Sequence, residues 1–203
     1  MMEDLYLERP NLYIGFHGCE KEVGLKLVNE PKGILSSTSD HEWLGKGFYV
    51  WENNQERAWD WANHHLPKPY KNPFVIGVVY TLGNCLDLTD SHFINLLSIS
   101  FEKFEKSLDA EDRLENKNGL HKLDCAVIEH FHKTCEQFAE DPIRYDSVRG
   151  AFYEGDVAYK GTEIRKKNHI QVCLRNMNCH QSNHIAWRRS ESRDRRTVSS
   201  NTD

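Results

Sequence analysis

Three short segments of the chain carry side chains that could do chemistry at the ends of predicted strands. They are Phe16-His17-Gly18, Gly47-Phe48-Tyr49 and His169-Ile170-Gln171. An imidazole can exchange a proton or hydrogen bonds, an aromatic face can stack on a flat ligand, and a glycine lets a ligand approach the backbone closely. Each segment alone also has an ordinary structural explanation, because a histidine at a strand end, a Gly-rich hairpin and a glutamine in a strand are all common.

The elements that would position these segments indicate a mixed α+β domain. Apolar runs predict strands at residues 12–16, 48–51, 73–81, 147–153 and 169–175. Helical spacing and apolar enrichment predict helices at residues 20–29, 55–65, 86–108 and 123–138. In the last strand the aliphatic residues alternate with His169, Gln171 and Cys173, so these three side chains share one face.

Composition places the chain among globular proteins. Hydrophobic residues make up 38% and charged residues 28% of its 203 residues, which is enough for a buried core and typical of one domain. The net charge of −5 argues against a protein that binds nucleic acid over its whole surface, although a local basic patch stays open. The sequence predicts no membrane span, since none of its apolar runs approaches the roughly 18 residues required. It also predicts no secretory signal, because the N-terminus is acidic.

The cysteines favour a reducing compartment. Positions 19, 85, 125, 135, 173 and 179 form no CxxC pair and the chain is not small, so we expect buried thiols in a cytoplasmic protein. The histidine and cysteine spacings match no zinc site, and no GxGxxG signature occurs. The sequence therefore predicts neither a bound metal nor a Rossmann-type nucleotide site.

The chain divides into a domain at residues 1–180 and a tail at residues 181–203. The tail lacks apolar periodicity and carries five arginines against three acidic residues. We expect a flexible basic tail, which would suit contact with RNA or DNA.

The order of motifs resembles the NAD-binding half of the ADP-ribosyltransferase superfamily. GFHG is followed by a helix, a polar loop, WLGKGFYVW and a second helix. This is similar to the histidine–tyrosine branch that contains diphtheria toxin and the poly(ADP-ribose) polymerases, and the resemblance covers residues 12–62. It implies an ADP-ribosyltransferase-like split β-sandwich with flanking helices, with NAD as a substrate and no metal.

The resemblance also implies roles for individual residues. The backbone of Gly18 would bond the nicotinamide amide, and His17 would bond the ribose on the adenosine side. Tyr49 would stack on the nicotinamide ring, and Trp61 or, as the alternative, Trp59 would form the other wall. Plain core packing is the competing explanation for the tryptophan.

Helical spacing favours Trp61 over Trp59. Ala58, Trp61 and Ala62 lie on one helix face, so Trp61 is predicted to face inward.

The third residue of the family pattern is where the sequence departs from it. The family places a glutamate at the start of a late strand, whereas the aligned position here is Gln171, which can bond a ribose hydroxyl but brings no negative charge. Glu154 and Glu163, in or near the preceding loop, are competing carboxylates. Glu154 could act as a general base for the acceptor nucleophile, or it could be an ordinary turn residue.

Two functions of different classes follow from the resemblance. The first is an NAD-dependent mono-ADP-ribosyltransferase that modifies a macromolecule. It could be a bacterial toxin paired with an antitoxin protein, or a phage-defence effector. A basic cluster at Arg149, Arg165, Lys166 and Lys167 favours nucleic acid over protein as the acceptor. The second is a catalytically weakened module that binds NAD or ADP-ribose, or an NAD glycohydrolase on the same fold. Transfer of an RNA 2′-phosphate is disfavoured, because it would require basic residues in place of Tyr49 and its aromatic partner.

Overall fold

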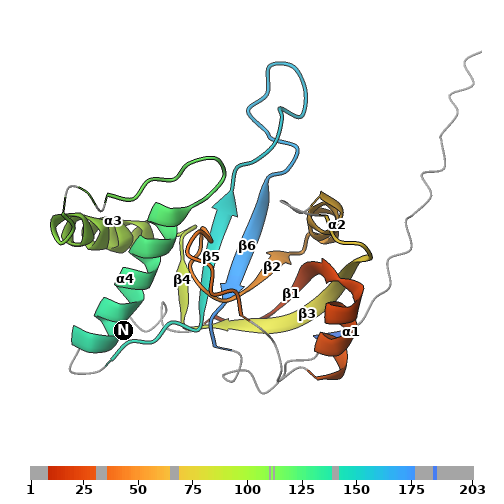
Figure 1. Ribbon diagram of the computed structural model, residues 1–203, viewed down its shortest axis with the longest axis horizontal. Coiled ribbons are helices and arrows are strands. Elements are labelled where there is room, and N and C mark those ends of the chain that lie inside the picture. The colour runs from red at the N-terminus through yellow and green to blue at the C-terminus, as the bar shows by residue number, and fades with distance from the viewer. Residues whose placement is uncertain are drawn as a thin grey trace, which may run out of the picture.

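The structure, a computed structural model, describes residues 9–30, 36–64, 69–109, 111, 113–138, 142–176 and 185–186. These residues form a mixed α+β fold, as predicted (Figure 1). None of the helices in these ranges is long and apolar enough to span a bilayer. The elements are β1 (Arg9–Glu20), α1 (Lys21–Asn29), β2 (Phe48–Glu52), α2 (Gln55–His64), β3 (Pro73–Gly83), β4 (Cys85–Asp87), α3 (Ser91–Lys106), α4 (Lys122–Phe138), β5 (Ser147–Phe152), β6 (His169–Leu174) and β7 (Ile185–Ala186).

Hydrogen bonds join the strands into one sheet in the order β4-β5-β6-β2-β1-β3-β7. Neighbouring strands run antiparallel except β4 and β5, which are parallel. The strands that carry the predicted site, β1, β2 and β6, are adjacent near the middle of this order. Segments that lie more than a hundred residues apart in the sequence therefore meet at the centre of the sheet.

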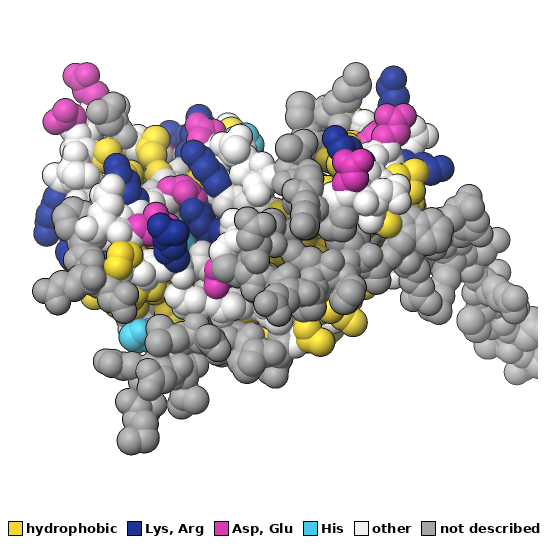
Figure 2. Space-filling model, turned by 90° about the horizontal axis from the view of Figure 1, so that it is seen from below, with side chains coloured by type: hydrophobic (Ala, Val, Ile, Leu, Met, Phe, Trp, Pro, Cys, Tyr) yellow, Lys and Arg dark blue, Asp and Glu magenta, His cyan; other side chains and the backbone are white. Residues whose placement is uncertain are grey.

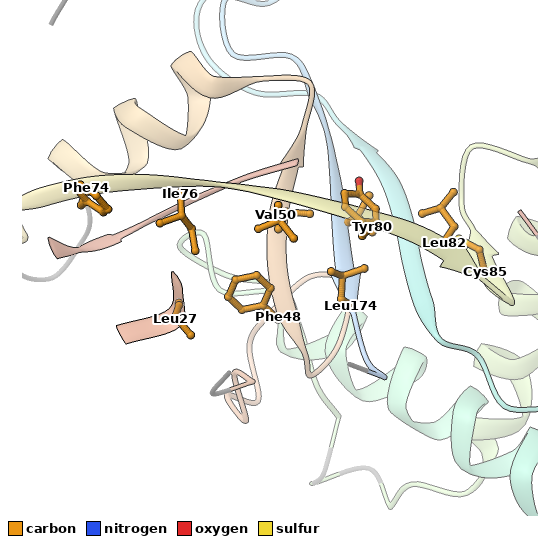
Figure 3. Packing of buried hydrophobic residues seen from close by; sticks show 11 residues of the cluster. Leu27, Phe48, Val50, Phe74, Ile76, Tyr80, Leu82, Cys85 and Leu174 are labelled. Atoms are coloured by element: carbon orange, nitrogen blue, oxygen red, sulfur yellow. The ribbon is translucent and has the colours of Figure 1, made fainter. Parts of the chain in front are cut away.

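One face of the sheet, called here the α1 face, is covered in part by α1. Phe48 and Val50 of β2 and Leu174 of β6 point to this side and pack with Leu27 of α1 (Figure 3). Because successive strand residues point to opposite faces, the residues between them point the other way. This arrangement fixes the side on which each candidate residue lies.

The opposite side, the α2 face, carries two clusters that leave the middle of the sheet between them. At one end α3 and α4 contribute Phe93, Ile128 and Phe131, which pack with Cys173 of β6. At the other end α2 places Ala58 beside a cluster of strand residues that includes Trp51. Figure 1 shows α3 and α4 grouped beyond β4 and β5, and α2 at the far side of the sheet.

Two sequence predictions need correction. The helix predicted for residues 86–108 begins only at Ser91, since Cys85–Asp87 pairs with β5 and the Asp90 carboxylate caps the helix by accepting a hydrogen bond from the His92 N–H (2.9 Å). The flexible tail predicted from residue 181 does not hold at Ile185–Ala186, which pairs with β3. The remaining tail residues lie outside the described ranges.

A network of buried charges ties three strands together on the α1 face. The guanidinium of Arg149 in β5 donates to both carboxylate oxygens of Glu52 in β2, at 2.8 and 3.0 Å. It also reaches Asp87 in β4 at 3.3 Å and the Thr89 hydroxyl at 3.0 Å. The Glu52 side chain is 10% and the Asp87 side chain 5% exposed, and the bond to Glu52 raises the pKa of Arg149.

We therefore expect Arg149→Leu to lower the free energy of unfolding by about 3 kcal/mol, because two buried carboxylates lose their cation. Urea denaturation measures this effect. Arg144→Leu is the matched control, since Arg144 is exposed, and it should change stability by no more than about 0.5 kcal/mol. Equal effects of the two changes would contradict the network's role.

Candidate functional site

Strands β1 and β2 separate within the predicted site. Their ladder pairs Gly15 with Glu52 and Phe16 with Trp51, whereas β1 stays paired with β3 as far as Glu20. Beyond Phe16, the edge of β1 that faces β2 therefore has no partner strand among the described residues.

The main chain of Gly18 belongs to this open edge. The carbonyl of Ile14 accepts a hydrogen bond from Asn53 (2.9 Å) at the end of β2, so the even-numbered residues of β1 turn their N–H and C=O groups toward β2. Gly18 follows the same alternation. Its N–H and C=O groups are thus directed into the separation between the strands, although the residue itself is buried.

His17 bridges the separated strands. Its Nδ1 lies 2.8 Å from the main-chain oxygen of Tyr49. Because a carbonyl oxygen only accepts, Nδ1 must carry the hydrogen, which leaves Nε2 of the neutral ring as an acceptor. Burial lowers the pKa of His17, and the bond to Tyr49 offsets part of that effect. The ring is therefore a neutral acceptor suited to a ribose hydroxyl.

The resemblance implies that the rings of His17 and Tyr49 share one cleft. In the structure they lie on opposite faces of the sheet. The imidazole lies against the ring of Phe48 (4.4 Å between centroids), on the α1 side of β2. The ring of Tyr49 belongs to the α2 face and packs beside Leu44. The contact between the two residues runs through the Tyr49 backbone, because neighbouring residues of a strand point to opposite faces.

The Tyr49 phenol holds the turn that precedes β2. Its hydroxyl donates to the carbonyl of Gly45 (2.6 Å) and accepts from the N–H of Leu44 (3.0 Å). Gly45 has a φ of +79°, which favours glycine. Burial raises the pKa of Tyr49, so the hydroxyl stays protonated. Only the face of the ring, and not its hydroxyl, is left to stack on a ligand.

Helix α2 occupies the position that a Cβ of residue 18 would take. A Cβ built there would lie 2.3 Å from the carbonyl oxygen of Ala58 and 3.2 Å from the Cβ of Ala62. Close helix packing thus requires the glycine whether or not a ligand binds at the backbone edge of the same residue. Both explanations apply at once, because the helix and the open edge lie on different sides of the residue.

The two candidate tryptophans of α2 differ in their environment. Trp59 packs against the cluster that contains Trp51 and Val75, in line with a structural role. Trp61 lies 5.7 Å from the ring of Trp51 and is 38% exposed. The predicted inward orientation is therefore only partly met, since Ala58 is fully buried whereas the indole of Trp61 lies at the margin of the helix face.

Gln171 lies on the α2 face, directly beside Trp51 in the β2–β6 ladder. It is 8% exposed, and its Oε1 accepts a hydrogen bond from the indole Nε1 of Trp43 (2.5 Å). His169 lies two residues earlier on the same face. Its Nδ1 donates to the Lys167 carbonyl (2.7 Å), and burial lowers its pKa.

A row of rings crosses the α2 face between the 36–47 segment and α2. Successive ring centroids lie 4.6, 5.3, 6.4 and 5.7 Å apart. We call this set the aromatic row; its members are Trp43, Phe152, His169, Trp51 and Trp61. Of these residues, the sequence indicated only Trp61 as a wall of the site, although the alternation in β6 had placed His169 beside Gln171. Trp43 and Phe152 gave no signal, because their contacts depend on strand register.

The carboxylate of Glu154 is already paired. It accepts a hydrogen bond from Arg57 Nη2 at 2.5 Å, and Arg57 Nη1 also donates to Asp60 (3.0 Å). Asp60 in turn pairs with Lys167 at 2.9 Å. These pairs tie α2 to both ends of the loop between β5 and β6, so Glu154 would have to leave Arg57 before acting as a base. Glu163 is exposed in the same loop, and its main-chain oxygen accepts from the Tyr153 hydroxyl.

The predicted basic cluster is smaller than expected. Arg149 belongs to the buried network with Glu52, and Lys167 is paired with Asp60. Arg165 lies over the ring of Tyr153 (5.3 Å), and Lys166 is exposed. On the face drawn in Figure 2, basic and acidic side chains are interspersed. The case for nucleic acid as the acceptor is therefore weaker than the sequence suggested.

A separate hollow of about 270 Å³ opens beside the turn at Lys46 and Gly47. Arg144 and Arg175 line it together with Glu136 and Asp146. Lys46 also lines it, so three basic side chains stand against two acidic ones, and the predicted site residues are not among those that line it. Within the described ranges, no three metal-binding side chains gather closely enough to hold an ion.

Comparison with known proteins gives a distant relative without an assigned activity. The chain is 26% identical over 179 residues to a protein of Methanocaldococcus jannaschii whose name is "Uncharacterized protein MJ0359". The match covers 79% of this chain and 81% of that protein. No family model matches the chain, and no solved structure matches it.

The state of the His17 ring can be measured directly. We expect it to remain the neutral Nδ1–H tautomer as the pH falls below 6.5, because burial opposes the charge. Since its pKa is lower in the folded than in the unfolded state, protonation favours unfolding, and stability falls as the pH drops through that range. Long-range proton–nitrogen NMR spectra report the tautomer, and His17→Gln assigns the signal. A ring charged at pH 6.5 would contradict this account.

Proposed function

We propose that the chain is an NAD-dependent mono-ADP-ribosyltransferase that modifies a macromolecule, on an ADP-ribosyltransferase-like split β-sandwich. The observation that carries the proposal is the separation of β1 and β2, with the His17 imidazole on the Tyr49 carbonyl and the open main chain of Gly18 beside it. This arrangement offers a neutral acceptor for a ribose and paired backbone groups for a carboxamide. The imidazole lies on the α1 side of β2, whereas the aromatic row lies on the α2 face.

The proposed reaction breaks the bond between nicotinamide and ribose. The nitrogen of nicotinamide leaves with the bonding electrons, and the sugar passes through an oxocarbenium-like state. An oxygen or nitrogen of the acceptor then bonds to the same sugar carbon and loses its proton. Flat aromatic walls and fixed backbone groups suit the leaving ring. A role as a toxin held by an antitoxin, or in phage defence, belongs to the same proposal.

A second candidate function is an NAD- or ADP-ribose-binding module. Two observations favour it: Gln171 is uncharged, and Arg57 holds the Glu154 carboxylate. The described site therefore offers no unpaired carboxylate to stabilise positive charge on the sugar. An NAD glycohydrolase, in which water replaces the macromolecular acceptor, lies between these two functions.

Incubation with labelled NAD and cell extract tests the first function. We expect label to enter a macromolecule, with separate nuclease and protease treatment identifying its class. His17→Ala should weaken NAD binding about tenfold, the equivalent of one hydrogen bond. Arg144→Leu, an exposed change outside the site, should keep both binding and labelling. Unchanged binding in His17→Ala would contradict the assigned site.

Calorimetry with NAD separates the second function from the first. A binding module should show saturable heat without release of nicotinamide over hours. Glu154→Gln should leave its affinity unchanged within about twofold, because Arg57 keeps Asp60 as a partner. Steady release of nicotinamide by the unmodified protein would exclude the module. Release without macromolecular labelling would indicate the glycohydrolase.

A further inference from the structure

Trp43 is held rigidly against the strand next to Gln171. The loop that carries it is joined to the start of β2 by a bridge between Ser37 and Gly47. Its indole lies over Gly150 of β5, where a Cβ would come within 2.9 Å of the ring. On its other side the ring contacts Phe152 at 4.6 Å. Glycine at position 150 thus makes room for an indole whose position the surrounding residues fix.

The hydrogen bond from Trp43 decides which way the Gln171 amide turns. An indole N–H can only donate, so its partner must be the amide oxygen and not the amide nitrogen. The amide oxygen is thereby turned toward Trp43, and the two N–H groups point away from it. Within the described part of the chain, the Gln171 side chain makes no other hydrogen bond. This amide nitrogen is therefore not sealed from solvent, because it is not among the fully buried polar atoms that lack a partner.

We propose that Trp43 is a positioning residue that turns the N–H groups of Gln171 toward the site, so that the site takes the nicotinamide ribose of NAD through an accepting 2′-oxygen. This inference rests on the proposed function. It reverses the direction of the hydrogen bond that a carboxylate at this position would make, because a carboxylate accepts from the ribose hydroxyl. Gln171 accordingly binds and orients the sugar without supplying charge.

A ligand whose 2′-substituent can accept but not donate a hydrogen bond shows whether residue 171 donates to the ribose or accepts from it. The probe is NAD whose nicotinamide-ribose 2′-hydroxyl is replaced by fluorine, since fluorine accepts weakly and cannot donate. The unmodified protein should bind both NAD and the fluoro analogue. Gln171→Glu should lose at least about tenfold in affinity for the analogue relative to NAD, because the carboxylate repels fluorine whereas the hydroxyl of NAD can turn and donate.

Trp43→Phe tests the positioning role. The phenyl ring keeps an aromatic side chain in the loop but removes the N–H, so the Gln171 amide becomes free to turn. We expect the affinity for the fluoro analogue to fall several-fold more than the affinity for NAD, whose hydroxyl suits either orientation. A role in packing alone would weaken both ligands equally. If Trp43→Phe does not fold, Gln171→Glu carries the test.

The outcomes distinguish this inference from the proposed function. An unmodified protein that binds neither NAD nor the analogue overturns both. Binding of both ligands, with the same ratio of affinities in the unmodified protein, Gln171→Glu and Trp43→Phe, overturns only the inference. A changed ratio in the two variants supports it. In the free protein, Gln171→Leu should shift the Trp43 indole N–H resonance, and an unmoved resonance would also overturn the inference.

Discussion

The candidate site depends on one hydrogen bond, between the His17 imidazole and the main-chain oxygen of Tyr49. In a regular antiparallel ladder that oxygen would face a backbone N–H of β1. Here the His17 side chain donates this hydrogen bond in place of a backbone N–H of β1. The Tyr49 oxygen thus keeps a partner although the two strands stay apart. The separation of β1 and β2 leaves the backbone groups of Gly18 without a ladder partner at the centre of the described sheet.

The rest of the fold keeps that separation in place. On one side, α2 packs so closely on β1 that its main chain would touch any side chain at position 18. On the other side, the Tyr49 hydroxyl binds the turn at Gly45, so β2 begins from a fixed point. The network around Arg149 joins β2 to β4 and β5 on the α1 face. Each strand beside the opening is thus anchored by contacts outside it, which is the arrangement that a preorganised site needs.

Much of this could be predicted from the sequence, and the limits have physical causes. The motifs around His17 and Tyr49 predicted two strands and the helix that follows each, because glycine and aromatic positions act locally. The end predicted for the first strand at Phe16 is wrong, since β1 runs on to Glu20. Alternation in β6 placed His169 and Gln171 on one face for the same reason. The missed partners are distant in the chain: Trp43 and Gln171 are 128 positions apart, and Arg57 and Glu154 are 97 apart. Such contacts depend on the register of the whole sheet, which local pattern does not determine.

The pairs that join α2 to the loop between β5 and β6 have a consequence for how the protein responds to its surroundings. Asp60 and Lys167 are partly exposed, and dissolved ions weaken attraction between such groups. The attachment of the loop to α2 should accordingly be firmest in dilute buffer and loosen as ionic strength rises. The salt content of the medium would then change how freely this loop moves, even though the sheet stays unchanged.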